Sequence, residues 1–209
     1  MKRMKIYSNA SGGIKTSISK NSSTTTIRVA CVGDSITELT NYPTILSRLL
    51  GKNYVIDNFG VSGAKVTLDS DSPYLYSEAC RDATKFQPNI VVIMLGTNDA
   101  VPDFEQCRGN FVEDYLTLVE SFQSLASKPQ VWVVKPPPIF ADGMGLSIEA
   151  YSAEIVPAIV QVANKKNLPI IDVYSALQSP RFFTDGVHPN EEGAKLIAEV
   201  VYRVIVNKN

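Results

Sequence analysis

The sequence predicts a three-layer α/β/α domain, in which helices cover both faces of a five-stranded parallel sheet. Short apolar segments and longer segments with helical spacing alternate five times along the chain, a pattern typical of βα units. The chain has 209 residues, of which 44% are hydrophobic and 20% charged, so it is long enough for one domain with a sizeable core. We expect right-handed crossovers and the flavodoxin-like strand order 2-1-3-4-5.

Five apolar segments are the predicted strands. Residues 90–95 are apolar throughout, as expected for a strand that is buried on both faces. The predicted strands cover residues 27–32, 54–58, 90–95, 131–134 and 170–173. Because ligands of parallel sheets bind outside the carboxyl ends of the strands, the residues that follow these segments are the candidates for function.

Five further segments carry the signals of helices. Pro43 stands in the first turn of one helix and Gly51 follows its end, which are the positions that these residues favour. Ser147 is placed to cap the fourth helix, and Pro157 is expected to bend it because proline lacks a backbone donor. The predicted helices cover residues 43–50, 76–86, 110–126, 148–164 and 191–206.

Residues 27–209 are predicted to form a single domain without internal repeats. Residues 8–26 are rich in Ser, Thr, Asn and Gly, so we expect residues 1–26 to be a polar leader or edge segment outside the core. The chain begins with basic residues that no apolar segment follows, so a secretory signal is not expected. A cytoplasmic chain and a chain that has lost a signal are both compatible with this start, and we favour the cytoplasmic one.

Charge and cysteine content exclude several classes of protein. The net charge is −1 and no basic block occurs, which argues against nucleic acid or an anionic membrane surface as the main partner. No apolar run approaches the roughly 20 residues of a membrane helix. The three cysteines, Cys31, Cys80 and Cys107, are odd in number and irregularly spaced, so neither a disulfide framework nor a zinc site is expected.

Ser35 is the candidate nucleophile. It follows Gly33 and Asp34 directly after the first predicted strand, at the rim where α/β sheets bind their ligands. A serine in this place becomes a nucleophile only if the chain also supplies a base, an orienting acid and an oxyanion hole.

His188 is the only histidine in the chain, and imidazole is the side chain best suited to general base work near neutral pH. Asp185 precedes it by three residues and could orient the ring and stabilise the imidazolium. Pro189 disfavours helical backbone at His188, so the loop can turn the ring towards Ser35. Taken alone, a D-x-x-H pattern favours a simple loop before a helix over a catalytic pair.

Three donors are candidates for the oxyanion hole: the backbone N–H groups of Ser35 and Gly60 and the side-chain amide of Asn98. Glycine lets the backbone approach a substrate closely, and such donors stabilise the charge of a tetrahedral intermediate. Taken alone, Gly60 is more typical of an ordinary turn glycine and Asn98 of an amide that caps a loop.

Three acidic residues near these motifs have simpler roles in this interpretation. Asp34 and Asp99 are expected to accept hydrogen bonds from loop backbone. Glu38 is close enough to Ser35 in sequence to border the pocket, but we favour a solvated position on the surface.

Four stretches of the chain resemble blocks I, II, III and V of the SGNH hydrolases, also called GDSL-type esterases and lipases. The four residues that name the family occur in order: Ser35, Gly60, Asn98 and His188. The resemblance extends from residue 27 to residue 206, and the acid of the family falls on Asp185. It implies Ser35 as nucleophile, His188 as base, and the three oxyanion donors. Ile36 stands where many members have leucine, a conservative difference.

The resemblance also suggests a substrate. Residues 41–43, 58–64 and 136–138 are similar to those of members that remove acetyl groups from sugars, including sialate and xylan acetylesterases. We therefore expect a serine esterase that hydrolyses short-acyl, carbohydrate-type esters through an acyl-enzyme. Its partner would be a small-molecule ester such as an acetylated sugar, and neither a metal nor an organic cofactor is required.

Two alternatives stay open. A lysophospholipase or an acyl-thioesterase would use the same triad, and an apolar acyl channel would favour it over an acetylesterase, whose pocket should be small and open to a polar cleft. A non-catalytic flavodoxin-like binding module belongs to another class, and the presence of Ser35, Asp185 and His188 together argues against it. No G-x-G-x-x-G follows the first strand, so a dinucleotide domain is disfavoured.

Overall fold

The computed structural model describes residues 26–102, 108–141 and 144–207. Its five strands form one parallel sheet in the order β2-β1-β3-β4-β5, so the predicted fold class and strand order are confirmed. The strands are β1 (Ile27–Gly33), β2 (Tyr54–Gly60), β3 (Ile90–Met94), β4 (Gln130–Lys135) and β5 (Ile170–Asp172). The predicted leader, apart from Thr26, lies outside the described residues, as does Cys107.

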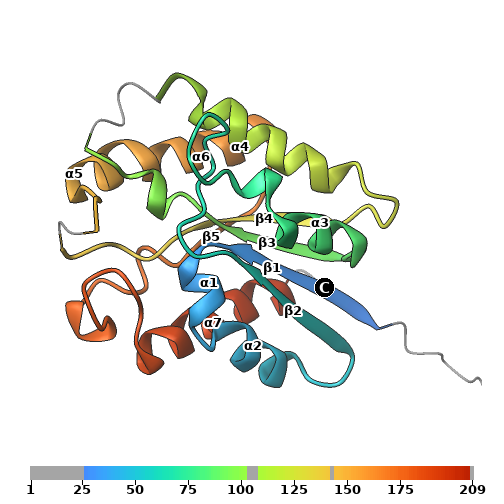
Figure 1. Ribbon diagram of the computed structural model, residues 1–209. Helices are drawn as coiled ribbons and strands as arrows, with labels where there is room; N and C mark the ends of the chain where they lie inside the picture. Colours follow the sequence, from blue (N-terminus) through green and yellow to red (C-terminus); the bar gives the residue numbers. More distant parts are fainter. Residues whose placement is uncertain (1–25, 103–107, 142–143, 208–209) are drawn as a thin grey trace, which may run out of the picture.

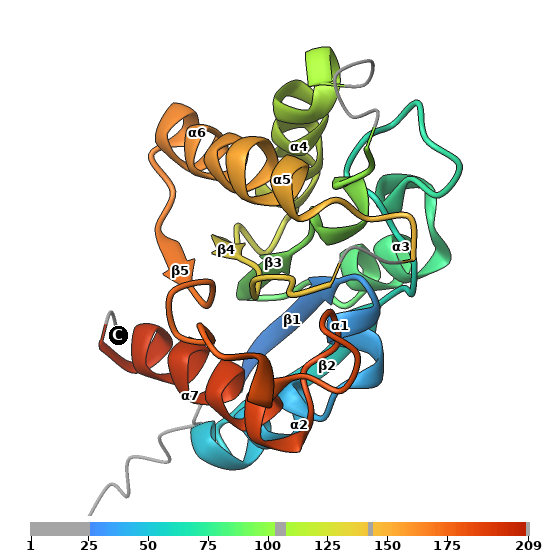
Figure 2. The same cartoon turned by 90° about the vertical axis from the view of Figure 1, so that its left-hand side faces the viewer.

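Helices cover both faces of this sheet (Figure 1). On one face lie α2 (Tyr42–Leu50) and α7 (Glu191–Asn207), which pack against each other. On the other face lie α3 (Glu78–Lys85), α4 (Arg108–Gln123) and α6 (Val156–Lys166), and the turned view in Figure 2 shows α4 beside α6. Two short helices, α1 (Ser35–Leu39) and α5 (Ile148–Ala150), complete the set.

The central strand β3 shows why the sheet carries a helical layer on each side. All five of its residues are buried, and because side chains alternate along a strand they serve two different cores. Val91 and Ile93 pack in the core beneath α4 and α6, whereas Val92 and Met94 pack in the core beneath α2 and α7. The uninterrupted apolar sequence of this strand therefore predicted correctly that helices cover both faces of the sheet.

The helix predicted at residues 76–86 is shorter in the structure. A 3₁₀ turn, Tyr74–Tyr76, precedes Ser77, and α3 begins only after this serine. The side chain of Ser77 accepts a hydrogen bond from the backbone N–H of Cys80 at 3.0 Å. Ser77 is therefore an N-cap with extended backbone, which separates the turn from the helix.

The helix predicted at residues 148–164 is continuous but not uniform. Between α5 and α6 lies one π-helical turn, Tyr151–Ile155, directly before Val156 and Pro157. Proline donates no backbone hydrogen bond and its ring crowds the carbonyl four residues earlier, so a wider turn accommodates it. The irregularity that was predicted at Pro157 takes this form.

Candidate active site

The nucleophile stands at the junction of β1 and α1. Asp34 caps α1, because its Oδ1 accepts a hydrogen bond from the backbone N–H of Ile36 at 2.9 Å. Gly33 is packed so tightly that a Cβ there would overlap the side chain of Thr37. These two residues let the chain turn from strand to helix within one step, so Ser35 is held as the first residue of α1. Ser35 is 8% exposed.

Ser35, His188 and Asp185 form a continuous chain of hydrogen bonds. Ser35 Oγ lies 2.9 Å from His188 Nε2, and His188 Nδ1 lies 2.7 Å from Asp185 Oδ2. The other oxygen of Asp185 accepts the backbone N–H groups of Val187 at 2.9 Å and His188 at 2.7 Å. This geometry is what a serine needs to lose its proton to an oriented imidazole.

The pKa of Asp185 explains how the carboxylate stays charged. Burial acts to raise the pKa, but hydrogen bonds from the backbone and ring of His188 and from the backbone of Val187, together with the charge of His188, outweigh it. The pKa of Asp185 is held at about 2, below its ordinary value of 3.8. At neutral pH the side chain is therefore an anion that can stabilise a positive imidazolium.

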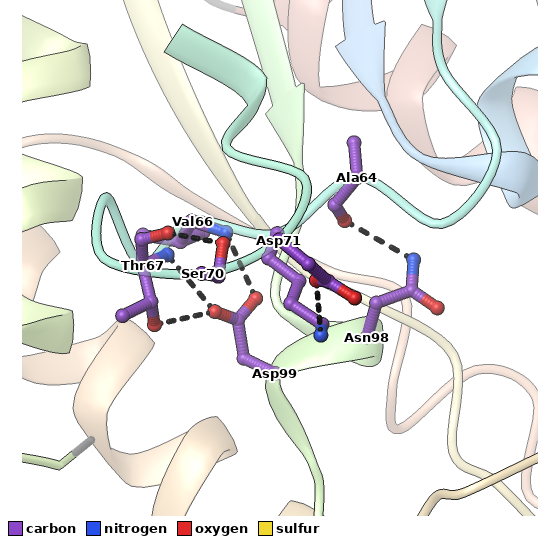
Figure 3. Close-up of polar contacts among 8 residues, drawn as sticks. Ala64, Val66, Thr67, Ser70, Asp71, Asn98 and Asp99 are labelled. Atoms are coloured by element: carbon purple, nitrogen blue, oxygen red, sulfur yellow. Dashed lines mark hydrogen bonds and ion pairs between the residues drawn. The ribbon is translucent and has the colours of Figure 1, made fainter. Parts of the chain in front are cut away.

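Asn98 is brought to the same rim by the turn Thr97–Asp99 after β3. One N–H of its side-chain amide donates to the carbonyl of Ala64 at 3.1 Å, as Figure 3 shows. A primary amide has two donors, so the second N–H is available to a ligand. The hydrogen bond to Ala64 orients the amide, which makes Asn98 a preorganised donor.

Gly60 does not join this group. It ends β2, and its backbone N–H donates to Asn58 Oδ1 at 2.9 Å. A Cβ at this position would overlap the backbone nitrogen of Glu38, so Gly60 is the contact between β2 and α1. Its role as an oxyanion donor stays a prediction that this geometry does not favour.

Gly63, three residues further on, lines the same cavity as Ser35, Asn98 and His188. Its φ of +77° lies in the left-handed region, which glycine adopts more readily than other residues do. Among the residues that the structure describes, the backbone N–H of Gly63 has no hydrogen-bond partner. Gly63 is therefore the residue that sequence reasoning missed. The signal was the length of β2, which extends to Gly60 and leaves Gly63 as the first glycine beyond the strand.

The loop that carries Gly63 is anchored to the turn after β3 (Figure 3). Asp99 accepts the backbone N–H groups of Val66 at 2.9 Å and Thr67 at 3.0 Å, and the hydroxyl of Thr67 at 2.7 Å. Asp99 thus accepts hydrogen bonds from loop backbone, as predicted, whereas Asp34 accepts one from the first turn of α1. Burial nevertheless raises the pKa of Asp99 to about 6, although these hydrogen bonds act to lower it.

Burial has a stronger effect on Asp34. Its side chain is 1% exposed, and its Oδ2 has no hydrogen-bond partner among the described residues. Burial raises the pKa of Asp34 to about 7, although the hydrogen bond from Ile36 opposes this shift. The carboxyl group of Asp34 is therefore protonated more readily than that of an ordinary aspartate.

The catalytic cavity has a volume of about 320 Å³. Its polar groups are those of Ser35, Ser62, Asn98 and His188. The rest of its lining is Leu39, Gly63, Met144, Leu146 and Val187. Leu39 and Met144 are 68% and 63% exposed, so two apolar side chains stand at the rim, and no sequence pattern predicted them.

The described residues lack two features that mark other classes of protein. Over residues 26–102, 108–141 and 144–207, no group of three or more His, Cys, Asp or Glu side chains is arranged to hold a metal ion. No helix in the same ranges has the length and apolar character needed to cross a membrane.

Comparison with known proteins identifies the family. The model of the GDSL-like lipase/acylhydrolase family matches residues 31–196. The chain belongs to this family. The predicted family is thereby confirmed, and the predicted class of enzyme, an esterase or acylhydrolase, is the class after which this family is named.

Individual proteins are also similar to this chain in sequence or in fold. An acetylxylan esterase from Xylanibacter ruminicola is 32% identical in an alignment of length 206, which covers 86% of this chain and 43% of that protein. The chain thus spans less than half the length of this relative. Two solved structures share the fold. A carbohydrate acetylesterase from Sinorhizobium meliloti has a TM-score of 0.71 at 19% identity, covering 88% of this chain and all of that one. An acetyl xylan esterase has a TM-score of 0.70 at 20% identity, covering 86% and 100% of the two chains.

Proposed function

We propose that this protein is a serine esterase that removes short acyl groups, acetyl above all, from carbohydrate-type esters. The observation that carries the proposal is the hydrogen-bonded chain from Ser35 through His188 to Asp185, which opens into a small cavity. The likeness to an acetylxylan esterase supports the choice of acetyl esters. The chemistry of the residues supplies the mechanism.

In the first step Ser35 Oγ attacks the carbonyl carbon of the ester while His188 Nε2 accepts the serine proton. Asp185 stabilises the imidazolium that forms. The carbonyl oxygen becomes an oxyanion, and we assign it three donors: the backbone N–H of Ser35, the side-chain amide of Asn98, and the backbone N–H of Gly63 in place of Gly60. A neutral carbonyl needs these donors less than the oxyanion does, so they favour the transition state.

In the second step the bond between the carbonyl carbon and the leaving alcohol breaks, and His188 gives its proton to that alcohol. The acyl group is now an ester of Ser35. A water molecule then attacks this ester while His188 accepts its proton, and collapse of the second intermediate releases the carboxylic acid and restores Ser35. No step requires a group from outside the chain and its substrates.

A lysophospholipase or thioesterase activity is the second candidate, and one observation favours it. Leu39 and Met144 expose apolar surface at the rim of the cavity, which could receive the start of an acyl chain. Against it stands the small volume of the cavity, which lies at the lower end of the roughly 300–1,000 Å³ typical of ligand sites. We therefore keep the short-acyl substrate as the first choice.

A series of p-nitrophenyl esters, from acetate to palmitate, tests the proposal, with Ser35→Ala as control. We expect the highest kcat/KM with acetate, no turnover in the variant, and release of acetate from acetylated xylo-oligosaccharides by the wild-type protein. A maximum at long chains would keep the mechanism and overturn the substrate. Hydrolysis that does not depend on Ser35 would overturn the mechanism itself.

A further inference from the structure

Glu38 connects the helix of the nucleophile to the loop of Gly63. It lies on α1, three residues after Ser35, and its side chain is exposed. Glu38 Oε2 accepts the backbone N–H of Ser62 at 2.7 Å and also the hydroxyl of Ser62. The predicted solvated role of Glu38 is therefore incomplete, because the carboxylate holds the residue that directly precedes Gly63.

A second contact joins the same two elements beneath Glu38. The amide of Asn58 donates to the carbonyl of Thr37 at 2.8 Å, while its oxygen accepts the backbone N–H of Gly60 at 2.9 Å. Gly60 itself lies directly against the backbone of Glu38. The end of β2 is thus fixed to α1 before the chain reaches Ser62.

The far side of Gly63 is fixed as well, through Asn98 and Ala64. Gly63 is therefore the one residue between two held neighbours, Ser62 and Ala64. The direction of the Gly63 N–H is set by the peptide plane that it shares with the carbonyl of Ser62. Whatever holds Ser62 consequently decides where this N–H points.

We propose that Glu38 is a positioning residue for the oxyanion hole: by binding Ser62, it aims the backbone N–H of Gly63 at the oxygen of the tetrahedral intermediate. The inference rests on the proposed esterase function. Because Ser35 and Glu38 belong to the same short helix, the nucleophile and the oxyanion donor move together as one unit.

In this proposal Glu38 acts through its position as a hydrogen-bond acceptor and not through its charge. A carboxylate close to a developing oxyanion opposes it, since like charges repel. What Glu38 contributes is an acceptor at a fixed place. A glutamine offers the same acceptor without the charge, so it should preserve most of the activity, whereas alanine should not.

The test compares Glu38→Ala, Glu38→Gln and Ser62→Ala with p-nitrophenyl acetate as substrate. We expect Glu38→Ala to lower kcat by about 10- to 100-fold with KM nearly unchanged, since a misplaced catalytic group can cost about 10²-fold. Glu38→Gln should stay within about threefold of wild type, and Ser62→Ala should fall between them because its backbone N–H remains. The double variant Glu38→Ala/Ser62→Ala should lose little more than Glu38→Ala alone.

A second readout separates aiming from folding. A short alkyl boronic acid forms a tetrahedral adduct with the nucleophilic serine and places an oxygen in the oxyanion hole, so its affinity should fall by the same factor as kcat. Melting temperatures show whether a variant is folded. Glu113→Ala is the matched control, because Glu113 is also an exposed glutamate that ties two elements, through Lys165 at 2.6 Å, and it does not line the cavity.

The outcomes separate the two proposals. If the wild-type protein hydrolyses acetate esters through Ser35 and Glu38→Ala keeps its kcat and its boronate affinity, the role of Glu38 is overturned and the esterase stands. Equal losses in Glu38→Gln and Glu38→Ala would likewise overturn it, because charge would then be the useful property. Absence of any Ser35-dependent hydrolysis would overturn both proposals. If Glu38→Ala does not fold, Glu38→Gln and Ser62→Ala decide by the same criteria.

Discussion

Two loops of the site are built in opposite ways: the loop of Asp185 and His188, called the acid–base loop, and the loop of Gly63, called the oxyanion loop. Asp185 and His188 are three residues apart, and the hydrogen bonds by which Asp185 holds the ring and the backbone N–H of His188 stay within that span. Gly63 is held by partners far away in sequence: Glu38 binds Ser62 across 24 residues and Asn98 binds Ala64 across 34. The first loop takes its acid–base geometry from its own residues, with one distant contact from the backbone N–H of Phe140 to the carbonyl of Gly186, whereas the second depends on distant partners at both of its ends.

Because of this difference, the two loops should tolerate substitutions elsewhere in the molecule to different degrees. The acid–base loop should keep its shape under changes on β2 and in the turn after β3, because these elements supply none of the hydrogen bonds between Asp185 and His188. The oxyanion loop should respond to changes on α1, on β2 and in the turn after β3, because each supplies a contact.

Replacing Asp185 by Asn should have the largest effect. The amide oxygen can still accept the backbone N–H groups of Val187 and His188, so the loop should survive, but the imidazolium loses its charged partner. We expect kcat with p-nitrophenyl acetate to fall on the order of 10⁴-fold with little change in melting temperature, as in other serine triads. Loss of the fold in this variant would contradict a loop that is specified locally.

Replacing Asn98 by Ala should have the next largest effect. It removes one oxyanion donor together with the bond to Ala64. We expect kcat to fall by about 10²–10³-fold, the usual effect of losing such a donor, while KM changes little. A change in KM alone would show that Asn98 binds the ground state rather than the oxyanion.

Gly60 and Gly63 should respond differently to alanine. A Cβ at Gly60 meets the backbone of Glu38, whereas a Cβ at Gly63 meets no atom within 4 Å. We expect Gly60→Ala to lower the free energy of unfolding by about 1–3 kcal/mol through overpacking. Gly63→Ala should cost about 1 kcal/mol, from its positive φ. Urea denaturation of both variants measures the difference, and a larger loss in Gly63→Ala would contradict the structural role assigned to Gly60.

The buried acids beside the site should make stability depend on pH. The pKa of Asp34 is raised to about 7 and that of Asp99 to about 6, from 3.8. Between pH 4 and 7 the native protein therefore keeps protons that the unfolded chain has lost, so these two groups make stability fall as pH rises through that range. Each contributes at most about 1.4 kcal/mol per pH unit.

The variant Asp34→Asn isolates one of these two groups. Its free energy of unfolding should vary less between pH 4 and 7 than that of the wild-type protein. Asp185 does not disturb this comparison, because its lowered pKa of about 2 costs stability only as pH falls below about 4. An unchanged slope would show that Asp34 is ionised in the folded protein throughout this range.

Much of the fold could be predicted because its signals are short in range. An apolar strand such as Ile90–Met94 shows its double burial in its own letters. The two catalytic side chains of the acid–base loop share a four-residue motif. Even the boundary of α3 was present in the sequence, since Ser77 is a favoured N-cap residue.

The missed features depend on three-dimensional contacts. Gly60 and Gly63 are both glycines of one turn-like stretch, and only the packing of Gly60 against α1 shows which of them faces the cavity. The helix α1 has five residues, too few for a periodic pattern to appear. The bond between Glu38 and Ser62 needs the sheet to bring α1 beside the end of β2, and no local pattern contains that information.

In the proposed mechanism Ser35 carries the acyl group during turnover, so trapping the acyl-enzyme is the most direct test. The wild-type protein would be mixed with p-nitrophenyl acetate, quenched in acid within the first turnover, digested and analysed by mass spectrometry. We expect one added acetyl group on the peptide that contains Ser35, together with a burst of p-nitrophenol of about one equivalent per protein. Continued hydrolysis with no acetyl group on Ser35 would contradict it.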